Sequence, residues 1–266
     1  MVCYDLSMYK TLDIDSYRKK FGLADDYKVD GLLVSGVWDL LAEREHLPYL
    51  IKTLEMMGIK SPVKRIEGEQ LGHAYAFDVH GKHYWFVPVM GAAYMSKYAH
   101  LACLLGSKKN ILIGVVGGLK KGVKPGDFII PTYSTGNQNA FMYDREAENL
   151  RFYPDKRLSQ QLKDKLGNVT VLEGPTVTCE VMLAETIEDV QQWSEEGYLG
   201  VEMEAATMFA LSKHFKVPAA AILTVADNLI EETTFFHDAY DDTKEVRESA
   251  RRMRYEVALA ELLGVE

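Results

Sequence analysis

Short runs of consecutive apolar residues alternate along this chain with longer segments in which apolar residues recur every three or four positions. A short apolar run that ends at glycine or at a turn predicts a buried strand, and the three-to-four spacing predicts a helix with one apolar face. The predicted strands span residues 30–36, 74–79, 83–89, 109–119, 126–132, 169–178 and 218–228, and the segment 197–203 is predicted to be extended as well. The predicted helices span residues 14–21, 40–57, 93–105, 159–166, 184–195, 204–214 and 244–263.

The order of these elements predicts an α/β fold, because strands that alternate with helices build a sheet covered by helical layers. The second and third predicted strands are separated only by a short His-Gly turn, which predicts a hairpin and therefore some antiparallel pairing. The polar stretch 133–153 predicts a long loop. We expect one domain over residues 30–266, preceded by an N-terminal extension over residues 1–29.

Composition narrows the class of protein. The chain has 266 residues, of which 47% are hydrophobic, and this is enough for one large core. Its net charge of -9 argues against a general nucleic-acid binder, because such a protein needs a basic surface to hold phosphates. Three cysteines without a CxxC pair predict neither a disulfide framework nor a zinc site and favour a cytoplasmic location. No secretory signal or membrane-spanning helix is expected, because the apolar runs are too short.

The segment GYLGVEMEAATMFALS, residues 197–212, places two carboxylates inside an otherwise apolar run. A buried carboxylate is costly unless it is paired or hydrogen-bonded. Glu204 stands at the predicted start of a helix, where backbone N–H groups and the helix dipole favour a negative charge. That position does not account for Glu202, and a carboxylate beside a strand end is a good acceptor for the vicinal hydroxyls of a sugar.

Three of the predicted strands end in residues that are suited to a ligand. One ends in the glycines of 114–118, one runs into 202–204, and one ends in Ala226-Asp227-Asn228. Ligands of open α/β sheets bind at the carboxyl ends of the strands, so these three ends together predict a binding site. Taken alone, Asp227 is more typical of a turn or a helix cap after a strand.

Four segments resemble the nucleoside phosphorylase and nucleosidase superfamily. GYLGVEMEAATMFALS resembles the V-E-M-E-A segment that holds the ribose, and VPVMGAA (87–93) resembles a strand and turn with a methionine beside the sugar. IGVVGGLKKGVKPGDFIIPT (113–132) resembles the glycine-rich strand end and the strand after it, and VPAAAILTVADN (217–228) resembles the strand that delivers a catalytic aspartate. The resemblance implies a three-layer α/β/α sandwich whose mixed central sheet is partly barrel-like.

The resemblance also implies roles for individual residues. Glu204 would accept hydrogen bonds from the 2'- and 3'-hydroxyls of the ribose, with Glu202 as a second carboxylate near the sugar and the base. Asp227 would be the general acid that protonates the leaving base at N7, which requires a raised pKa of its carboxyl group. The other implied substrate contacts are Met203, Met90, Val116, Gly117, Met182 and Asn228.

The positions that hold phosphate in the family's phosphorylases differ in this chain. Leu40 and Leu112 stand where the resemblance leads us to expect arginines, and Val115 stands where it leads us to expect serine or threonine. Ala226 replaces a serine before the aspartate. Arginine is the usual clamp for a phosphate dianion, so these losses favour attack by water over attack by phosphate.

The sequence therefore favours a nucleosidase that hydrolyses the N-glycosidic bond of a purine nucleoside. Asp39 and Glu43 are the candidates for orienting the water, with His46 behind them. Two alternatives stay open, namely phosphorolysis to free base and ribose 1-phosphate through a rebuilt phosphate site, and a nucleoside-binding protein without catalysis. The resemblance implies a homo-oligomer, either a dimer or a hexamer. No metal or cofactor is expected, and neither is a nucleic-acid or membrane partner.

Overall fold

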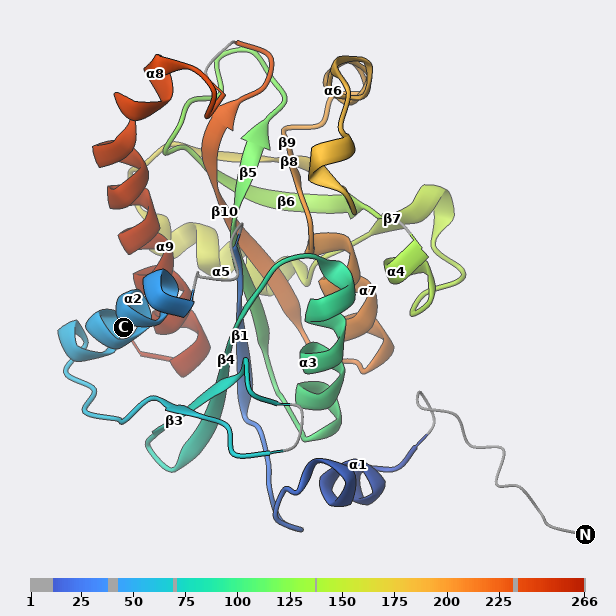
Figure 1. Ribbon diagram of the computed structural model, residues 1–266, viewed down its shortest axis with the longest axis vertical. Coiled ribbons are helices and arrows are strands. Elements are labelled where there is room, and N and C mark those ends of the chain that lie inside the picture. Colours follow the sequence, from blue (N-terminus) through green and yellow to red (C-terminus); the bar gives the residue numbers. More distant parts are fainter. Residues whose placement is uncertain (1–11, 38–42, 69–70, 137, 232–233, 266) are drawn as a thin grey trace, which may run out of the picture.

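The computed structural model describes residues 12–37, 43–68, 71–136, 138–231 and 234–265. Its strands form one ten-stranded sheet in the order β10-β6-β8-β9-β5-β1-β4-β3-β2, with β7 beside β6 (Figure 1). The strands are β1 Gly31–Gly36, β2 Lys64–Arg65, β3 Tyr75–Val79, β4 Lys82–Val89, β5 Asn110–Gly118, β6 Phe128–Thr135, β7 Arg151–Phe152, β8 Val171–Thr178, β9 Gly200–Glu202 and β10 Ala219–Asn228.

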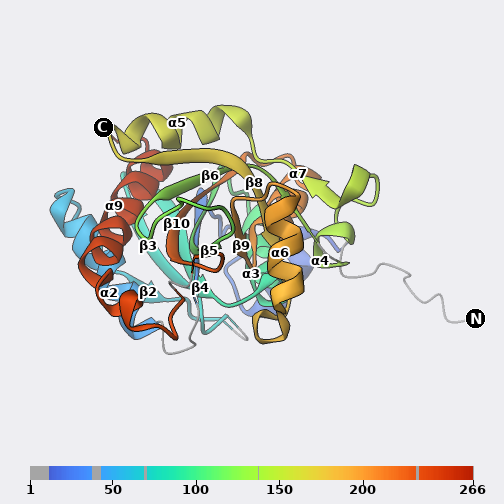
Figure 2. The same cartoon turned by 90° about the horizontal axis from the view of Figure 1, so that it is seen from above.

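Five of these strands close into a barrel, because β5 pairs with β10 as well as with β9. The ring runs β5-β10-β6-β8-β9, and Figure 2 looks into it from above. The parallel pair β5–β10 carries a shift in register between Val225 and Asp227. On the far side of β5, the parallel strands β1 and β4 extend the sheet, and the hairpin β3–β4 with the short β2 forms its edge.

Helices cover both faces of the sheet (Figure 1). On one face, α3 (Ala92–Leu104) and α7 (Ala205–His214) pack against each other over the largest cluster of buried apolar residues. On the other face lie α2 (Glu43–Met56), α5 (Lys156–Leu166) and α9 (Lys244–Leu263), over a second apolar cluster. The predicted fold class is confirmed, since a mixed and partly barrel-like sheet lies between helical layers.

The remaining helical segments are short and lie around this framework. They are α1 Ile14–Phe21, α4 Gln138–Phe141, α6 Ile187–Glu195, α8 Asp238–Asp241 and the 3-10 turns η3 Glu148–Leu150 and η4 Met182–Ala184. Within the predicted N-terminal extension, Tyr17 and Phe21 of α1 pack against the main core cluster. None of the helices within the described ranges is long and apolar enough to span a membrane.

Several element ends differ from the sequence prediction; the helix predicted from residue 159, for example, begins at Lys156 after the cap Asp155. The segment 133–153, predicted as a loop, contains the end of β6, the helix α4 and the strand β7. These pieces are two to four residues long after β6 ends, so they are too short to show a hydrophobic period. The helix predicted from residue 184 begins at Ile187, because Thr186 and Asp189 form a reciprocal capping box that fixes its start.

Candidate active site

Four parallel strands, β1, β4, β5 and β10, end at the same edge of the sheet (Figure 1). The short strand β9 runs antiparallel to β5 and pairs Val201 with Gly117. On its other side, Gly117 pairs with Asp227 of β10. The segment predicted to hold the sugar and the strand predicted to supply the acid therefore flank the same glycine.

The side chain of Glu204 lies between two glycines at these strand ends. Its Oε1 accepts a hydrogen bond of 2.6 Å from the backbone N–H of Gly91. Its other oxygen, Oε2, faces Gly36, where a Cβ atom would lie only 2.7 Å away. Gly91 also has a φ angle of 83°, which is a conformation that favours glycine. Glu204 can reach the strand ends because Gly36 lacks a side chain.

Glu202, two residues earlier, binds the start of helix α7. Its Oε2 accepts from the backbone N–H groups of Glu204 at 2.7 Å and Ala205 at 2.6 Å. Its Oε1 accepts from the hydroxyls of Thr178 and Ser134. Glu204 makes no side-chain cap bond of its own. The role at the helix start that the sequence suggested for Glu204 therefore belongs to Glu202.

These two carboxyl groups differ in protonation. Burial, followed by the negative charge of Glu202, raises the pKa of Glu204 to about 8. Burial also raises the pKa of Glu202, but the hydroxyl and N–H donors around it oppose the rise. Glu202 is thus the member of the pair that holds the charge, and Glu204 is protonated at neutral pH, so it can donate as well as accept hydrogen bonds.

Asp227 lies at the end of β10, directly after the register shift against β5. It is 8% exposed, and its Oδ2 accepts from the backbone N–H of Phe235 at 3.3 Å. Burial raises the pKa of Asp227 to about 6, against the opposing effects of the Phe235 bond and the Arg247 charge. A carboxyl group with this pKa exchanges its proton near neutral pH, as a general acid must.

The other predicted substrate contacts surround these groups. Met203 is half-buried, with its Cε atom 3.9 Å from the place of a Cβ on Gly91, and Met90 is the half-buried residue before that glycine. Val116 is buried against Gly200, and Gly117 lies under Leu229. These residues sit at the same strand ends, in agreement with their predicted grouping.

Met182 and Asn228 have different surroundings. Met182 begins the 3-10 turn η4 and is half-buried. The amide of Asn228 donates to the carbonyls of Lys120 and Val123, and its oxygen accepts from the N–H of Ile230. Asn228 thus joins the loop after β5 to the loop after β10, and its contact with a substrate stays a prediction.

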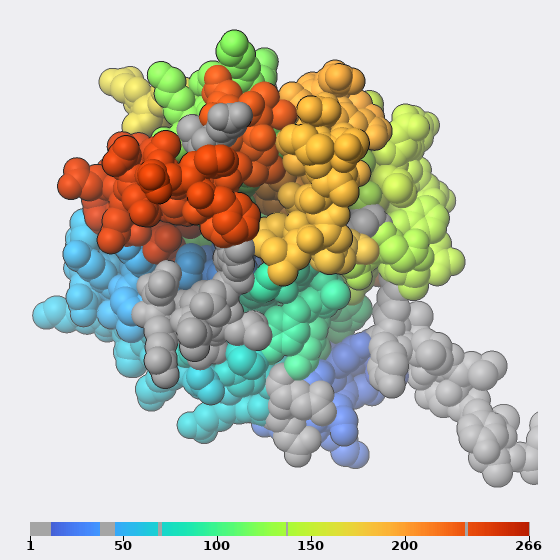
Figure 3. All heavy atoms as spheres, turned by 45° about the horizontal axis from the view of Figure 1, so that its top comes forward, coloured from blue at the N-terminus to red at the C-terminus, as the bar shows by residue number. Residues whose placement is uncertain are grey.

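Two segments flank the strand ends at the surface. Figure 3 shows α8 and the start of α9 in red on one side, and the α6 segment in gold on the other. The rings of Phe235 and Phe236, just before α8, have centroids 3.8 Å apart and are exposed by 37% and 80%. On the α6 side, burial raises the pKa of Glu185, and the charges of Asp189 and Asp227 add to the rise.

The family model described as Phosphorylase superfamily matches residues 54–262, which is most of the chain. The chain belongs to the phosphorylase superfamily. This membership confirms the resemblance seen in the sequence.

The superfamily relatives include DeoD-type purine nucleoside phosphorylases. That of Clostridium beijerinckii is 30% identical over 151 residues, which cover 53% of this chain and 61% of that protein. That of Bacillus cereus (strain B4264) is 32% identical over 152 residues, covering 54% and 64%. The aligned region therefore spans less than two thirds of the length of these relatives. The crystal structure of uridine phosphorylase from Vibrio fischeri ES114 matches with a TM-score of 0.70 at 17% identity, over 97% of this chain and 99% of that one, which shows a shared fold.

The residues that stand in place of the expected phosphate ligands differ in burial. Leu112 is fully buried in the core, and Val115 is 38% exposed. Asp39 and Leu40 lie outside the described residues, and so does the side chain of Glu43, whose backbone begins α2.

His46 and Arg254 lie on the α2 and α9 side of the same strands. Burial, together with the charges of Arg254 and Arg251, lowers the pKa of His46 to about 3, and its Nδ1 lies 2.9 Å from the Ser35 hydroxyl. The sequence analysis did not single out Arg254, which is fully buried and donates to the carbonyl of Gly114. The only sequence signal for Arg254 was its place among the apolar positions of α9.

Proposed function

We propose that this chain cleaves the N-glycosidic bond of a purine nucleoside at the strand ends that carry Glu204 and Asp227. The observation that carries the proposal is this pair of buried carboxyl groups with raised pKa values, from segments that pair with the two sides of Gly117. Membership of the phosphorylase superfamily supports cleavage of a glycosidic bond. The names of the DeoD-type relatives support a purine nucleoside as the substrate.

Asp227 would act on the base. Departure of a purine leaves negative charge on the ring, and a proton delivered from Asp227 to N7 neutralises it. Only the protonated carboxyl group can donate, and the pKa of Asp227 is about 6. We therefore expect kcat/KM for base release to fall as the pH rises above about 6.

Glu204 would hold the sugar. The N–H of Gly91 orients Oε1, so Oε2 beside Gly36 would face the 2'- and 3'-hydroxyls of the ribose. As the bond to the base breaks, the sugar ring gains positive charge, and the charge held on Glu202 would stabilise it. Glu202 would position Glu204 by fixing the start of α7. Met203 and Met90 would pack against the sugar, with Val116, Gly117 and Met182 around the base.

The acceptor of the ribosyl group would be water or phosphate. Leu112 and Val115 support water, because neither side chain can donate a hydrogen bond to phosphate, and hydrolysis is the reaction that the sequence favours. Arg254, which lies under the same strand ends, supports phosphate. The homo-oligomer and the cytoplasmic location stay predictions.

Product analysis with adenosine, inosine and guanosine, with and without phosphate, tests the proposal. We expect release of free base by the wild type, a loss of roughly 100-fold or more in Asp227→Asn, and no loss in the exposed control Asp26→Asn. Ribose formed without phosphate would identify hydrolysis, and ribose 1-phosphate formed only with phosphate would identify phosphorolysis. Thermal stabilisation by a nucleoside without any release of base would contradict the proposal and indicate a binding protein.

A further inference from the structure

Glu185 is a half-buried carboxyl group that the proposed mechanism does not use. It lies between β8 and α6, directly after the turn η4. Burial raises the pKa of Glu185, a hydrogen bond from Cys179 opposes the rise, and the charges of Asp189 and Asp227 add to it. The exposed residues around it in the chain include apolar ones, namely Val181, Leu183 and Ile187. On most surface turns the acidic residue is exposed and the apolar ones are buried, so this reversed arrangement needs a reason.

The backbone places Glu185 beside the residues predicted to surround the base. Strands β8 and β9 are parallel and pair Thr178 with Glu202, so the chain leaves both strands at the same place. There the backbone N–H of Cys179 donates to the carbonyl of Glu202 at 2.7 Å. The N–H of Glu185 donates to the carbonyl of Met182 at 3.1 Å, so these two residues belong to one turn. Glu185 thus shares its turn with Met182, a predicted contact of the base.

The same segment packs against the chain that follows Asp227. Cys179 and Leu229 both contact one small apolar cluster, which consists of Leu119, Val177, Val190, Tyr198 and Val201. Leu229 lies two residues after Asp227, and its side chain covers Gly117. Glu185 therefore stands on the α6 side of the strand end that carries Asp227, in agreement with the effect of the Asp227 charge on its pKa.

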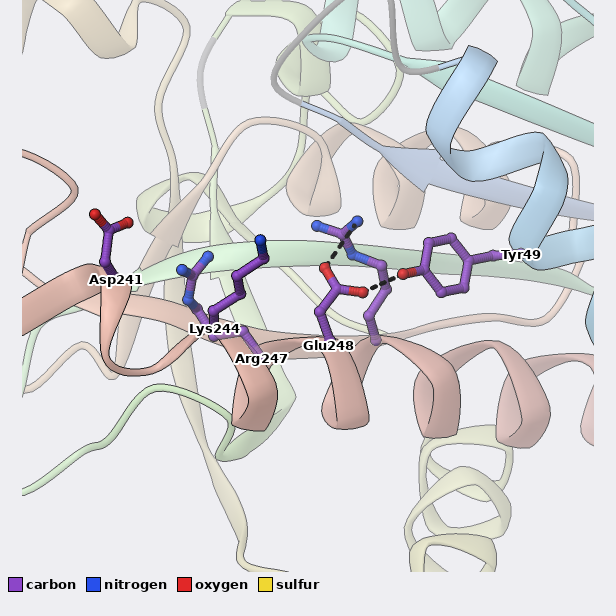
Figure 4. A pocket seen from close by; sticks show the side chains of 6 residues that line it. Tyr49, Asp241, Lys244, Arg247 and Glu248 are labelled. Atoms are coloured by element: carbon purple, nitrogen blue, oxygen red, sulfur yellow. Dashed lines mark hydrogen bonds and ion pairs between the residues drawn. The ribbon is translucent and has the colours of Figure 1, made fainter.

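The opposite side of Asp227 is basic. The charge of Arg247 opposes the rise in the pKa of Asp227, and the guanidinium carbon of Arg247 lies 3.5 Å from the centroid of the Tyr240 ring. Arg247 lines a hollow of about 450 Å³ between α2 and α9 (Figure 4). The other residues of this hollow are Tyr49, Asp241, Lys244, Glu248 and Arg251. A base bound at Asp227 would thus have basic groups on one side and Glu185 on the other, which favours hydrogen-bond donors of the base on the Glu185 side.

The group at C6 of a purine, next to N7, differs between the common bases. In adenine it is an amino group, which donates hydrogen bonds, whereas in guanine and hypoxanthine it is a carbonyl, which accepts them. When Asp227 donates to N7, a carboxylate beside it can accept from an amino group at C6. The same carboxylate would face a carbonyl oxygen with no hydrogen between the two acceptors, which is unfavourable.

We propose that Glu185 accepts a hydrogen bond from the amino group at C6 of the base and so selects nucleosides of 6-aminopurines, such as adenosine. This inference rests on the proposed function, because that function places N7 of the base at Asp227. Glu185 takes no part in the transfer of the proton to N7. Its role is to determine which purine is bound, so its substitution should change the preference between bases.

Steady-state kinetics with three nucleosides tests the role of Glu185. The nucleosides are adenosine, inosine and purine riboside, which carries only hydrogen at C6. We expect the wild type to prefer adenosine to inosine by roughly 10-fold or more in kcat/KM. Glu185→Gln keeps the size of the side chain and can donate as well as accept, so the ratio of adenosine to inosine should fall by roughly 10-fold. Glu188→Gln, exposed on α6, is the matched control and should keep the wild-type ratio.

Purine riboside separates a role in specificity from a role in folding. Relative to purine riboside, kcat/KM of Glu185→Gln should fall for adenosine and rise for inosine. An equal change for all three nucleosides, or an unchanged ratio of adenosine to inosine, would overturn the role of Glu185, while base release by the wild type would still support the proposed function.

Calorimetric binding of adenosine and inosine replaces the kinetics if the wild type releases no base. A preference for adenosine that Glu185→Gln loses and Glu188→Gln keeps would then support the role of Glu185 and overturn the proposed function. Equal binding of both nucleosides by the wild type, or binding of neither, would overturn both.

Discussion

The buried charges on the two sides of the strand ends differ in how many of their hydrogen bonds are made within the chain. On the α7 side, backbone N–H groups and hydroxyls surround the charge of Glu202, and Glu204 is protonated at neutral pH. On the α9 side, Arg254 has one edge bound and one edge without a partner among the described residues. A buried charge that the described residues satisfy is accounted for by the fold, whereas the open edge of Arg254 can still donate hydrogen bonds.

The pH dependence of stability is the strongest test of the α7 side. The pKa of Glu204 is about 8 in the folded chain against an ordinary value of 4.5, so the folded chain binds this proton more tightly than the unfolded chain does. The resulting stability is complete below pH 4.5 and is lost as the pH rises towards 8. The side chain of Glu204→Gln cannot ionise, so the variant keeps its stability while the wild type loses stability. Over this pH range the difference in free energy of unfolding should shift in favour of the variant by roughly 2 to 5 kcal/mol.

Urea unfolding across this pH range measures the gain, with the exposed Glu195→Gln as a matched control. The control should follow the wild type at every pH. A constant difference between Glu204→Gln and the wild type would contradict the raised pKa of Glu204. If Glu202→Gln, and not Glu204→Gln, gained stability relative to the wild type as the pH rises, Glu204 would be the charged carboxyl group and Glu202 the protonated one.

Gly36 tests both sides at once, because it lies between Glu204 and Gly114. In Gly36→Ala the new Cβ would stand 2.7 Å from Oε2 of Glu204, so the carboxyl group has to move. We expect kcat/KM for base release to fall by about 100-fold, since misplacement of a catalytic group by about 1 Å has effects of this size. Gly72→Ala is the control, because nothing lies within 4 Å of its Cβ position. Wild-type activity in Gly36→Ala would show that Glu204 does not hold the substrate.

The fold was largely accessible from the sequence, because periodic apolar patterns report which residues are buried. The helix Lys244–Leu263 and the strand ending at Asn228 were predicted with bounds within a residue of those observed. The closure of the barrel was implied only by the resemblance, since a pattern of burial does not say that β5 pairs with both β9 and β10. Two-residue strands such as Arg151–Phe152 carry no period at all.

The residues of the candidate site could be predicted from the sequence only where they belong to a motif. The segments with Glu204 and Asp227 could be selected from the sequence, and the structure brings them to the two sides of Gly117. Which of Glu202 and Glu204 faces the start of α7 depends on backbone angles at the junction of strand and helix, where Glu204 has φ -135° and ψ -30°. A functional role for Arg254 could not be predicted, because the sequence does not show which groups surround a charged residue at an apolar helix position.

Glu202→Ala tests whether the carboxylate of Glu202 is needed as the acceptor for the backbone N–H groups at the start of α7. The substitution leaves the N–H groups of Glu204 and Ala205 without their acceptor, at a buried helix start. We expect the free energy of unfolding to fall by about 2 kcal/mol, and base release to weaken because Glu204 loses its support. Chemical unfolding measures the loss, and Glu195→Ala, exposed on α6, should change it by less than about 0.5 kcal/mol. Unchanged stability would mean that water replaces the carboxylate at no cost, so Glu202 would not be needed for the fold.

The smallest expected effect comes from adding a donor to the α9 side. Val115 pairs with Thr224 across β5 and β10, so the two side chains share a face of the sheet, and Thr224 is the residue that Arg254 binds. Val115→Thr replaces a methyl group by a hydroxyl at a position that is 38% exposed, so it costs little stability. A phosphate on the open edge of Arg254 would gain one hydrogen bond, and we expect binding about threefold tighter in calorimetry. The exposed Val181→Thr is the matched control and should bind phosphate as the wild type does. Weaker binding in Val115→Thr would place the anion away from this strand, and an equal gain in Arg254→Met/Val115→Thr would show that the hydroxyl acts without the arginine.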